Sequence, residues 1–207
     1  NFTIGNDSPL FEKLSSMPVK LGDISEIFVG LQTSADTVFL FKEYTEQTDG
    51  YQVISKALNE NVVVEKELLK QVVRSGEIGR YWARPTALVL FPYLSLLGKS
   101  KLISEIDLKK KYPRTWNYLL LNKKLLSQRE HGKFKETGWY QLYPKNLDSW
   151  ERPKIMIPYM VTRLSAYYDE NDYYFVNVIT GGFGLVLREA LGKPQYTVGL
   201  INSKLLD

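Results

Sequence analysis

The stretch KIMIPYMVTRLSAYYDENDYYFVNVITGGFGLVLR, residues 154–188, decides the fold class. It is rich in β-branched and aromatic residues, and turns such as Gly181-Gly182 interrupt it at short intervals, which is typical of consecutive strands. We predict strands here over residues 154–160, 163–168, 173–179 and 183–188. The same texture predicts earlier strands over residues 27–31, 37–44, 51–58, 87–91 and 139–143.

Helix signals are fewer and stand mainly near the two ends. Asp7-Ser8-Pro9 predicts the start of a helix that ends near Pro18, because a short polar side chain precedes a proline in the first turn. A last helix is expected to begin near Gln195. Residues 65–73 predict a short helix, since acidic residues stand at its N-terminal end.

A helical insert is predicted between the two groups of strands, at about residues 100–130. Ser104 with Asp107 resembles a capping box, and Pro113 suits the first turn of the helix that follows. The expected fold class is therefore α+β. It is mainly β, as a meander or barrel-like sheet, with a basic helical insert and terminal helices.

The composition is that of a globular domain, with 44% hydrophobic and 24% charged residues among 207. We expect residues 1–20 to form a linker helix and residues 21–207 to form one domain. The chain opens on Asn1 and stops inside the last expected helix. We therefore expect it to be a piece of a longer protein.

Positive charge is concentrated in the middle of the chain. Residues 99–154 hold 14 Lys and Arg against 6 Asp and Glu, whereas the rest of the chain holds 13 against 17. Basic side chains gathered on one face neutralise phosphates and release counterions, so an anionic partner is favoured. The alternative is a solvated helical face without a ligand.

The residue inventory argues against several classes of protein. The chain has no cysteine and one histidine, His131, which leaves too few soft ligands for a zinc site. No apolar run reaches the ~20 residues that a membrane helix needs, and the N-terminal residues lack a signal-peptide pattern. We expect a cytoplasmic protein with no metal and no membrane partner.

Catalytic motifs are missing as well. An adenine methyltransferase needs Asn or Asp before Pro-Pro-aromatic, but Phe91-Pro92-Tyr93 and Ile157-Pro158-Tyr159 have no polar residue before the proline. Gly181-Gly182-Phe183-Gly184 is interpreted as a hairpin turn rather than a phosphate loop, because strands are predicted on both sides. Asp107-Leu108-Lys109, the nearest match to a nuclease motif, lies on an expected solvated helix. We predict no catalytic residue and no bound cofactor in this chain.

A series of short motifs runs from about Leu21 to Leu206. They are Gly30-Leu31-Gln32-Thr33-Ser34 with Val38-Phe39; Arg80-Tyr81-Trp82 with Leu90-Phe91-Pro92-Tyr93; Tyr112-Pro113 with Tyr118-Leu119; Leu126-Ser127-Gln128-Arg129; Trp139-Tyr140; Pro153-Lys154-Ile155-Met156-Ile157-Pro158; and Gly199-Leu200-Ile201-Asn202-Ser203-Lys204-Leu205. In this order and spacing they resemble the C-terminal specificity domain of TaqI-like adenine-N6 DNA methyltransferases and related single-chain type II restriction-modification enzymes. One departure is Tyr143-Pro144-Lys145, which stands where the family often has Gly-Arg.

The resemblance implies a target-recognition domain that binds one side of double-stranded DNA. A separate catalytic methyltransferase domain of the same parent chain would then flip an adenine out of the duplex and methylate it. S-adenosyl-L-methionine is expected in that catalytic domain and not in this part of the chain. Whether the parent enzyme also cleaves DNA stays open.

Candidate DNA contacts are loop residues whose side chains can bond phosphates or base edges. The first cluster is the turn of Gln32, Thr33, Ser34 and Asp36, for which the alternative is plain turn chemistry. A second pair is Arg80 and Arg84 beside Trp82, for which the alternative is cation–π packing. A third cluster comprises Arg129, His131, Lys133, Lys135, Lys145 and Asn146, where the alternative is a disordered basic loop.

Two other functions fit the same residues. Fourteen tyrosines and the basic middle are compatible with a module that binds single-stranded nucleic acid or RNA, which needs exposed aromatic side chains beside lysines. A specificity or protein-interaction domain that meets DNA only through a partner is the other alternative. The tryptophans at positions 116, 139 and 150 and Tyr140 are expected in the core rather than on a stacking surface.

Overall fold

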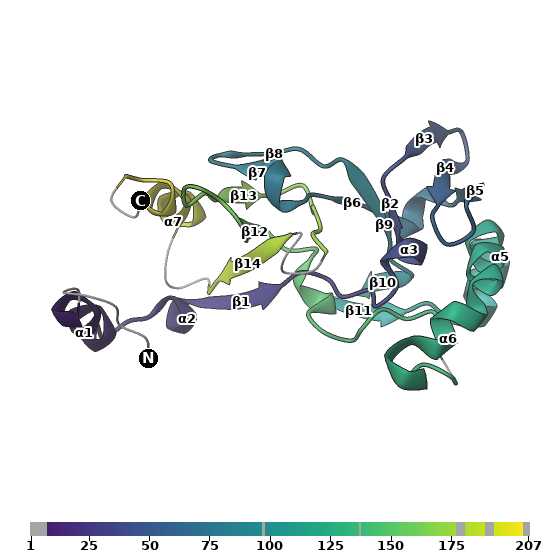
Figure 1. Cartoon of the computed structure of the whole chain (residues 1–207), viewed down its shortest axis with the longest axis horizontal. Coiled ribbons are helices and arrows are strands. Elements are labelled where there is room, and N and C mark those ends of the chain that lie inside the picture. Colours follow the sequence, from purple (N-terminus) through teal and green to yellow (C-terminus); the bar gives the residue numbers. More distant parts are fainter. Residues whose placement is uncertain (1–7, 97, 137, 177–180, 189–192, 205–207) are drawn as a thin grey trace.

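The computed structural model describes residues 8–96, 98–136, 138–176, 181–188 and 193–204, and it confirms a mixed α+β fold (Figure 1). The helices are α1 (Ser8–Ser16), α2 (Leu21–Ile24), α3 (Asp36–Phe39), α4 (Glu105–Lys111), α5 (Pro113–Leu121), α6 (Lys123–Gly132) and α7 (Pro194–Ile201). The strands are β1 (Ser25–Val29), β2 (Leu40–Phe41), β3 (Tyr44–Gln47), β4 (Gly50–Ser55), β5 (Glu60–Val64), β6 (Leu69–Val72), β7 (Ile78–Gly79), β8 (Trp82–Ala83), β9 (Ala87–Leu90), β10 (Tyr93–Leu96), β11 (Lys99–Leu102), β12 (Lys154–Pro158), β13 (Tyr167–Asp169) and β14 (Gly182–Leu187). Short 3-10 turns lie at Lys66–Leu68, Ser75–Glu77 and Leu147–Ser149.

The strands form small antiparallel sheets rather than one continuous sheet. The largest has the order β1-β14-β12-β13, and two three-stranded sheets have the orders β2-β9-β6 and β3-β4-β5. The hairpins β10–β11 and β7–β8 stand apart from these. A meander is present as β3-β4-β5, but the strands predicted over 27–31 and 37–44 do not join it as neighbours, because β1 pairs with β14 and β2 pairs with β9. The barrel-like alternative is wrong for the described residues.

The four-stranded sheet separates two apolar layers. Phe28 faces the main core, while Ile155 and Leu185 pack with Val198 and Ile201 of α7 on the other side. A Cβ on Gly184 would lie 2.2 Å from the Phe28 ring, so only glycine lets that ring pack against the strand. Gly182 is the first residue of β14, so a strand follows Gly181 and not the helix that a phosphate loop requires. Residues 177–180, on the other side of the predicted turn, lie outside the described residues.

The main core joins this sheet to the rest of the molecule through aromatic rings. Trp150 is fully buried and lies 5.2 Å from Phe28, 5.1 Å from Tyr174 and 4.9 Å from Phe175, measured between ring centroids. Isolated parallel bridges, Leu31↔Val176 and Val72↔Tyr174, tie the same region to β6 and to the loop after β1. Residues 177–179 of the predicted strand 173–179 lie outside the described residues.

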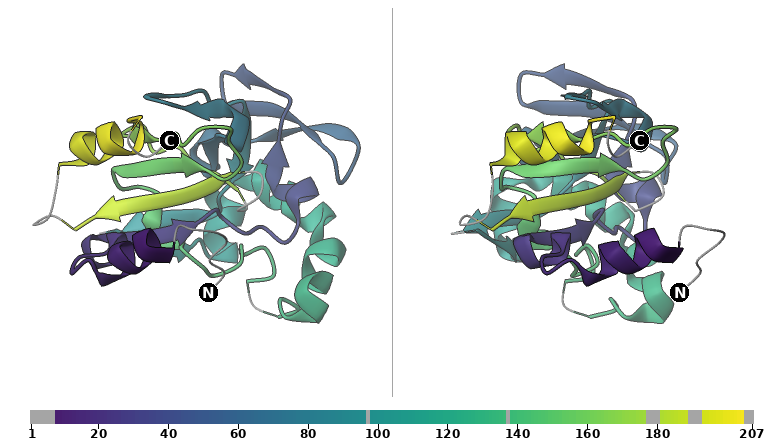
Figure 2. Two further views of the ribbon diagram at one scale, coloured as in Figure 1. Left: turned by 60° about the vertical axis from the view of Figure 1, so that its left-hand side comes forward. Right: turned by 90° about the vertical axis from the view of Figure 1, so that its left-hand side faces the viewer.

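The helical insert lies at one end of the molecule, and α1 and α7 lie at the other (Figures 1 and 2). The local signals for its helices are confirmed: the Ser104 hydroxyl accepts a 3.1 Å hydrogen bond from the Asp107 amide, and Pro113 begins α5. No helix of the described residues is long and apolar enough to cross a membrane.

Residues 37–44, predicted as one strand, are divided between α3, β2 and β3, so this prediction is partly wrong. The Thr33 hydroxyl accepts from the Ala35 amide at 3.1 Å and donates to the Asp36 carboxylate. These local bonds favour a helical turn over a strand ladder. In the helical turn the consecutive residues Val38 and Phe39 are both buried in the core, whereas a strand would point them to opposite faces.

The helix predicted over residues 65–73 is also largely wrong, because only Lys66–Leu68 form a 3-10 turn and β6 follows. The carboxylate of Glu65 does not support a helix of its own. It accepts hydrogen bonds from the amides of Arg114 and Thr115 at 2.9 and 2.8 Å, at the start of α5. The contact between Glu65 and the start of α5 therefore replaces the expected interaction of Glu65 with the first turn of a helix at residues 65–73.

The segment 139–143, predicted as a strand, is a turn. Trp139 and Tyr140 are both buried although they are neighbours, and a strand would point them to opposite faces. The strands predicted over residues 27–31, 51–58, 87–91, 154–160 and 183–188 are found with shifted or shorter bounds, and of residues 163–168 only Tyr167 and Tyr168 belong to β13. Residues 173–176, the described part of the predicted strand 173–179, form only isolated bridges at Tyr174 and Val176, so no strand is found there. The tryptophans at 116, 139 and 150 and Tyr140 are 0–6% exposed, which confirms their assignment to the core.

Candidate functional site

The loop of residues 31–36 follows β1 and leads into α3. Thr33 is completely buried, Gln32 is half-buried, and Ser34 and Asp36 are exposed. Ser34 has a φ of 52°, in the left-handed region, so the loop turns sharply there. Thr33 thus shapes the turn, whereas Gln32, Ser34 and Asp36 are the side chains with access to a ligand.

Arg129 holds this loop from the inside. Its guanidinium donates from Nη1 to the carbonyl of Thr33 at 2.6 Å and from Nη2 to the carbonyls of Trp139 and Gln141 at 2.9 and 2.8 Å. Its Nε bonds the carbonyl of Leu126 at 2.9 Å. Burial lowers the pKa of Arg129 to about 10, so the group keeps its charge at neutral pH. Its geometry favours a positioning role over a direct contact with DNA.

The helix α6 breaks where Arg129 turns inward. The ψ angle of Arg129 is 151°, and Glu130 and His131 have φ angles of 49° and 57°, far from helical values. Gly132 follows with a φ of 80°. The regular helical backbone of the insert therefore stops before Arg129.

The same region brings the first and third candidate clusters together. The amide of Tyr143 donates to the carbonyl of Gln32 at 3.0 Å, and Asn146 Nδ2 donates to the carbonyl of Val29 at 3.3 Å. Lys133 lies with its Nζ 4.7 Å from the centre of the Tyr143 ring. We call the surface of Gln32, Ser34, Asp36, Lys133, Lys135, Lys145 and Asn146 the composite surface.

Arg80 and Arg84 lie elsewhere, on and beside the β7–β8 hairpin. Arg80 Nε bonds the carbonyl of Leu164 at 3.2 Å, and the Arg84 guanidinium lies 5.6 Å from the centre of the Trp82 ring. Tyr81 and Trp82 are 63% and 45% exposed. The hairpin and α6 lie on opposite sides of the molecule in every view (Figures 1 and 2). The structure therefore separates this pair from the composite surface.

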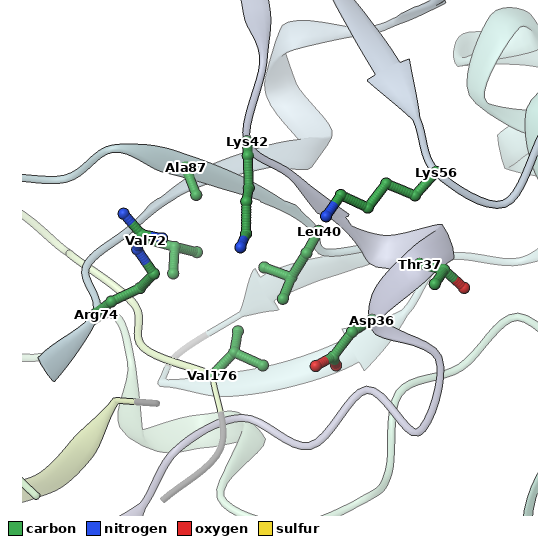
Figure 3. Close-up of a pocket in the computed structure, with 9 residues that line it drawn as sticks. All are labelled: Asp36, Thr37, Leu40, Lys42, Lys56, Val72, Arg74, Ala87 and Val176. Atoms are coloured by element: carbon green, nitrogen blue, oxygen red, sulfur yellow. The ribbon is translucent and has the colours of Figure 1, made fainter. Parts of the chain in front are cut away.

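Sequence reasoning did not select a pocket that borders the 31–36 loop. Its volume is about 210 Å³, and Lys42, Lys56 and Arg74 reach it from three different segments, with Asp36 at its edge (Figure 3). Lys42 follows β2, Lys56 follows β4 and Arg74 comes just after β6. Since these three residues belong to no common motif, no sequence signal could have grouped them. We call this cavity the basic pocket.

The described residues hold no cluster of three or more His, Asp or Glu side chains placed to bind a metal ion. In the nuclease-like triplet, the Asp107 carboxylate accepts a 2.7 Å hydrogen bond from the hydroxyl of Ser104, the N-cap of α4, and pairs with Lys111 at 3.6 Å. These contacts are those of a helix surface, as expected from the sequence.

The chain is similar to the type II methyltransferase M.BanIII of Aneurinibacillus aneurinilyticus, with 26% identity over 154 residues. The alignment covers 72% of this chain and 24% of that protein, so the chain spans about a quarter of the length of the relative. No family model matches the chain. The similarity identifies a methyltransferase-related protein.

Proposed function

We propose that this chain is a target-recognition domain that reads double-stranded DNA for an adenine-specific DNA methyltransferase, or for a single-chain restriction-modification enzyme. The alignment with M.BanIII carries this proposal, because 72% of the chain matches a type II methyltransferase while most of that relative lies outside the match. In the enzymes that the sequence resembles, one domain transfers the methyl group and another selects the site. The sequence of this chain has no motif of the former kind.

In this proposal residues 21–207 form the recognition domain, residues 1–20 link it, and no catalytic step occurs in this chain. A catalytic domain of the same parent chain supplies S-adenosyl-L-methionine binding and the transfer to adenine. The composite surface is the proposed contact with DNA, since its amide, hydroxyl and carboxylate groups can read base edges and its lysines can bond phosphates. Arg129 acts there as a positioning residue, because it holds the 31–36 loop through the Thr33 carbonyl.

One observation favours a second function, the binding of single-stranded nucleic acid. The hairpin residues Tyr81 and Trp82 are exposed next to Arg84, and exposed aromatic rings beside a cation can stack on unpaired bases. The remaining tryptophans of the chain are buried, so Trp82 of this hairpin is the tryptophan with access to a base.

Binding of the purified chain to a duplex, a single strand and an RNA of the same sequence separates these functions. We expect the duplex to bind best. Preference for the single strand or the RNA would instead favour the second function, the binding of single-stranded nucleic acid at the hairpin. We also expect no transfer from labelled S-adenosyl-L-methionine to DNA. Methylation by the chain alone would contradict the proposed division of labour.

A further inference from the structure

The basic pocket has an apolar floor and a charged rim. Val72, Ala87 and Val176 line it and are 1–3% exposed, and Leu40 is half-buried beside them. Around this floor stand the side chains of Lys42, Lys56, Arg74 and Asp36 (Figure 3). The pocket therefore combines a rigid base with polar groups that reach it from separate elements.

The cations on the rim differ in how they are held. Arg74 is fixed, because its Nε donates to Glu77 at 2.7 Å and its Nη2 donates to the Thr86 hydroxyl at 3.1 Å. Lys42 and Lys56 are exposed, and neither has a hydrogen bond or an ion pair with any residue that the structure describes. These two lysines therefore supply charge that the described part of the fold does not neutralise.

The size of the pocket limits its ligand. About 210 Å³ is less than the ~300–1,000 Å³ of a typical dedicated small-molecule site. A whole cofactor would not be enclosed, but one sugar and phosphate unit of a polymer that continues along the surface would fit. A floor without polar side chains suits a deoxyribose, and free ammonium groups suit phosphates.

We propose that Lys42 and Lys56 bind backbone phosphates of double-stranded DNA at the mouth of this pocket. This inference rests on the proposed function and extends it, since neither lysine belongs to the composite surface. Asp36 connects the two sites because it belongs to the 31–36 loop and also lines the pocket. Phosphates held by Lys42 and Lys56 place the adjacent bases beside Asp36, whose carboxylate accepts a hydrogen bond from an exposed amino group of cytosine or adenine.

The test is the salt dependence of binding to a short mixed-sequence duplex, measured by fluorescence anisotropy between about 50 and 200 mM salt. Each lost phosphate contact makes the slope of log K against log salt shallower by about 0.9. The double variant Lys42→Ala/Lys56→Ala should therefore lower the magnitude of the slope by about 1.8. The variant Lys42→Arg/Lys56→Arg should restore it.

The matched control is Lys13→Ala/Lys193→Ala, which removes two exposed lysines in α1 and directly before α7, outside the basic segment 99–154. The inference is overturned if Lys42→Ala/Lys56→Ala leaves the slope unchanged. It is also overturned if the control variant lowers the slope by the same amount, since the total charge of the chain would then explain the effect. Thermal melting checks that each variant is folded. If the unaltered chain binds no duplex, the proposed function is wrong. If it binds the duplex but the slope is the same with and without Lys42 and Lys56, only this inference is wrong.

Discussion

The replacement of Arg129 by alanine should be the most destabilising change at the candidate site. The side chain uses four of its five N–H donors on carbonyls of Thr33, Leu126, Trp139 and Gln141. A hydrogen bond from a charged group contributes ~1.5–3 kcal/mol, but bonds that share one side chain do not add. Arg129→Ala leaves four carbonyls without this donor, and a buried group left unsatisfied costs ~1–3 kcal/mol, so we expect the variant to lose about 4 kcal/mol of unfolding free energy.

Equilibrium unfolding in urea, followed by tryptophan fluorescence, measures this loss, because Trp139 and Trp150 are buried. Arg129→Lys keeps the charge but loses the planar fork, so it should recover only part of the stability. Lys133→Ala, an exposed neighbour, should change it by less than about 0.5 kcal/mol. A loss below about 1 kcal/mol in Arg129→Ala would refute the reasoning, and full stability in Arg129→Lys would show that the charge alone matters.

Three further predictions concern other parts of the chain. Lys154 and Asp169 form a fully buried ion pair at 2.6 Å, and Asp169→Ala would leave the Lys154 charge without its partner. We therefore expect this variant to lose ~3–5 kcal/mol of unfolding free energy, measured in urea. A loss under about 1 kcal/mol would count against this expectation. The hydrogen bond from Arg152 lowers the pKa of Glu26, so this pair stabilises the fold at neutral pH and the gain disappears as the pH falls through that lowered pKa. The unfolding free energies of the unaltered chain and Glu26→Gln should therefore differ by less than ~1 kcal/mol at pH 7, since the pair is half exposed. The two values should converge as the pH falls through the lowered pKa of Glu26, and a gap that widens in acid would reverse the assigned sign. In the intact parent enzyme, Lys133→Ala/Lys135→Ala should weaken binding to all sequences alike, whereas Gln32→Ala should cost ~1–3 kcal/mol on the cognate site and relax the preference at one base pair. Methylation of a randomised site library at two salt concentrations measures both effects. Unchanged sequence preference and salt dependence would remove these residues from the interface.

Local signals in the sequence predicted the helices of the insert well. Ser104, Asp107 and Pro113 act within one helical turn, so their effect does not depend on the rest of the fold. The strand over residues 87–91 was found for a similar reason, since β9 is apolar and buried at every position. Where the deciding contact lies within a few residues, the sequence was sufficient.

Contacts over long distances in the sequence account for the failures. Glu65 was assigned to a helix of its own, but its carboxylate bonds Arg114 and Thr115, about fifty positions later. The strand expected at 139–143 does not form because Arg129 takes the carbonyls of Trp139 and Gln141. Composition and hydrophobic period carry no information about such partners.

The candidate site was predicted in part. The sequence selected the 31–36 loop and the segment around Lys133 separately, and the structure joins them through the Tyr143 amide and the Gln32 carbonyl. It also selected Arg129 for its charge, although the side chain is 6% exposed and bonded within the chain. The basic pocket was missed because Lys42, Lys56 and Arg74 meet only after the chain has folded.

The bond from Arg129 to the Thr33 carbonyl has a consequence for protein engineering. A loop of six residues looks like a cassette that can be exchanged between related enzymes to change the preferred site. Its shape, however, depends on a guanidinium 96 positions away in the sequence and on the turn that the same guanidinium holds. A graft of residues 31–36 into another scaffold should keep its conformation only when the arginine and the turn at 139–141 are transplanted with it.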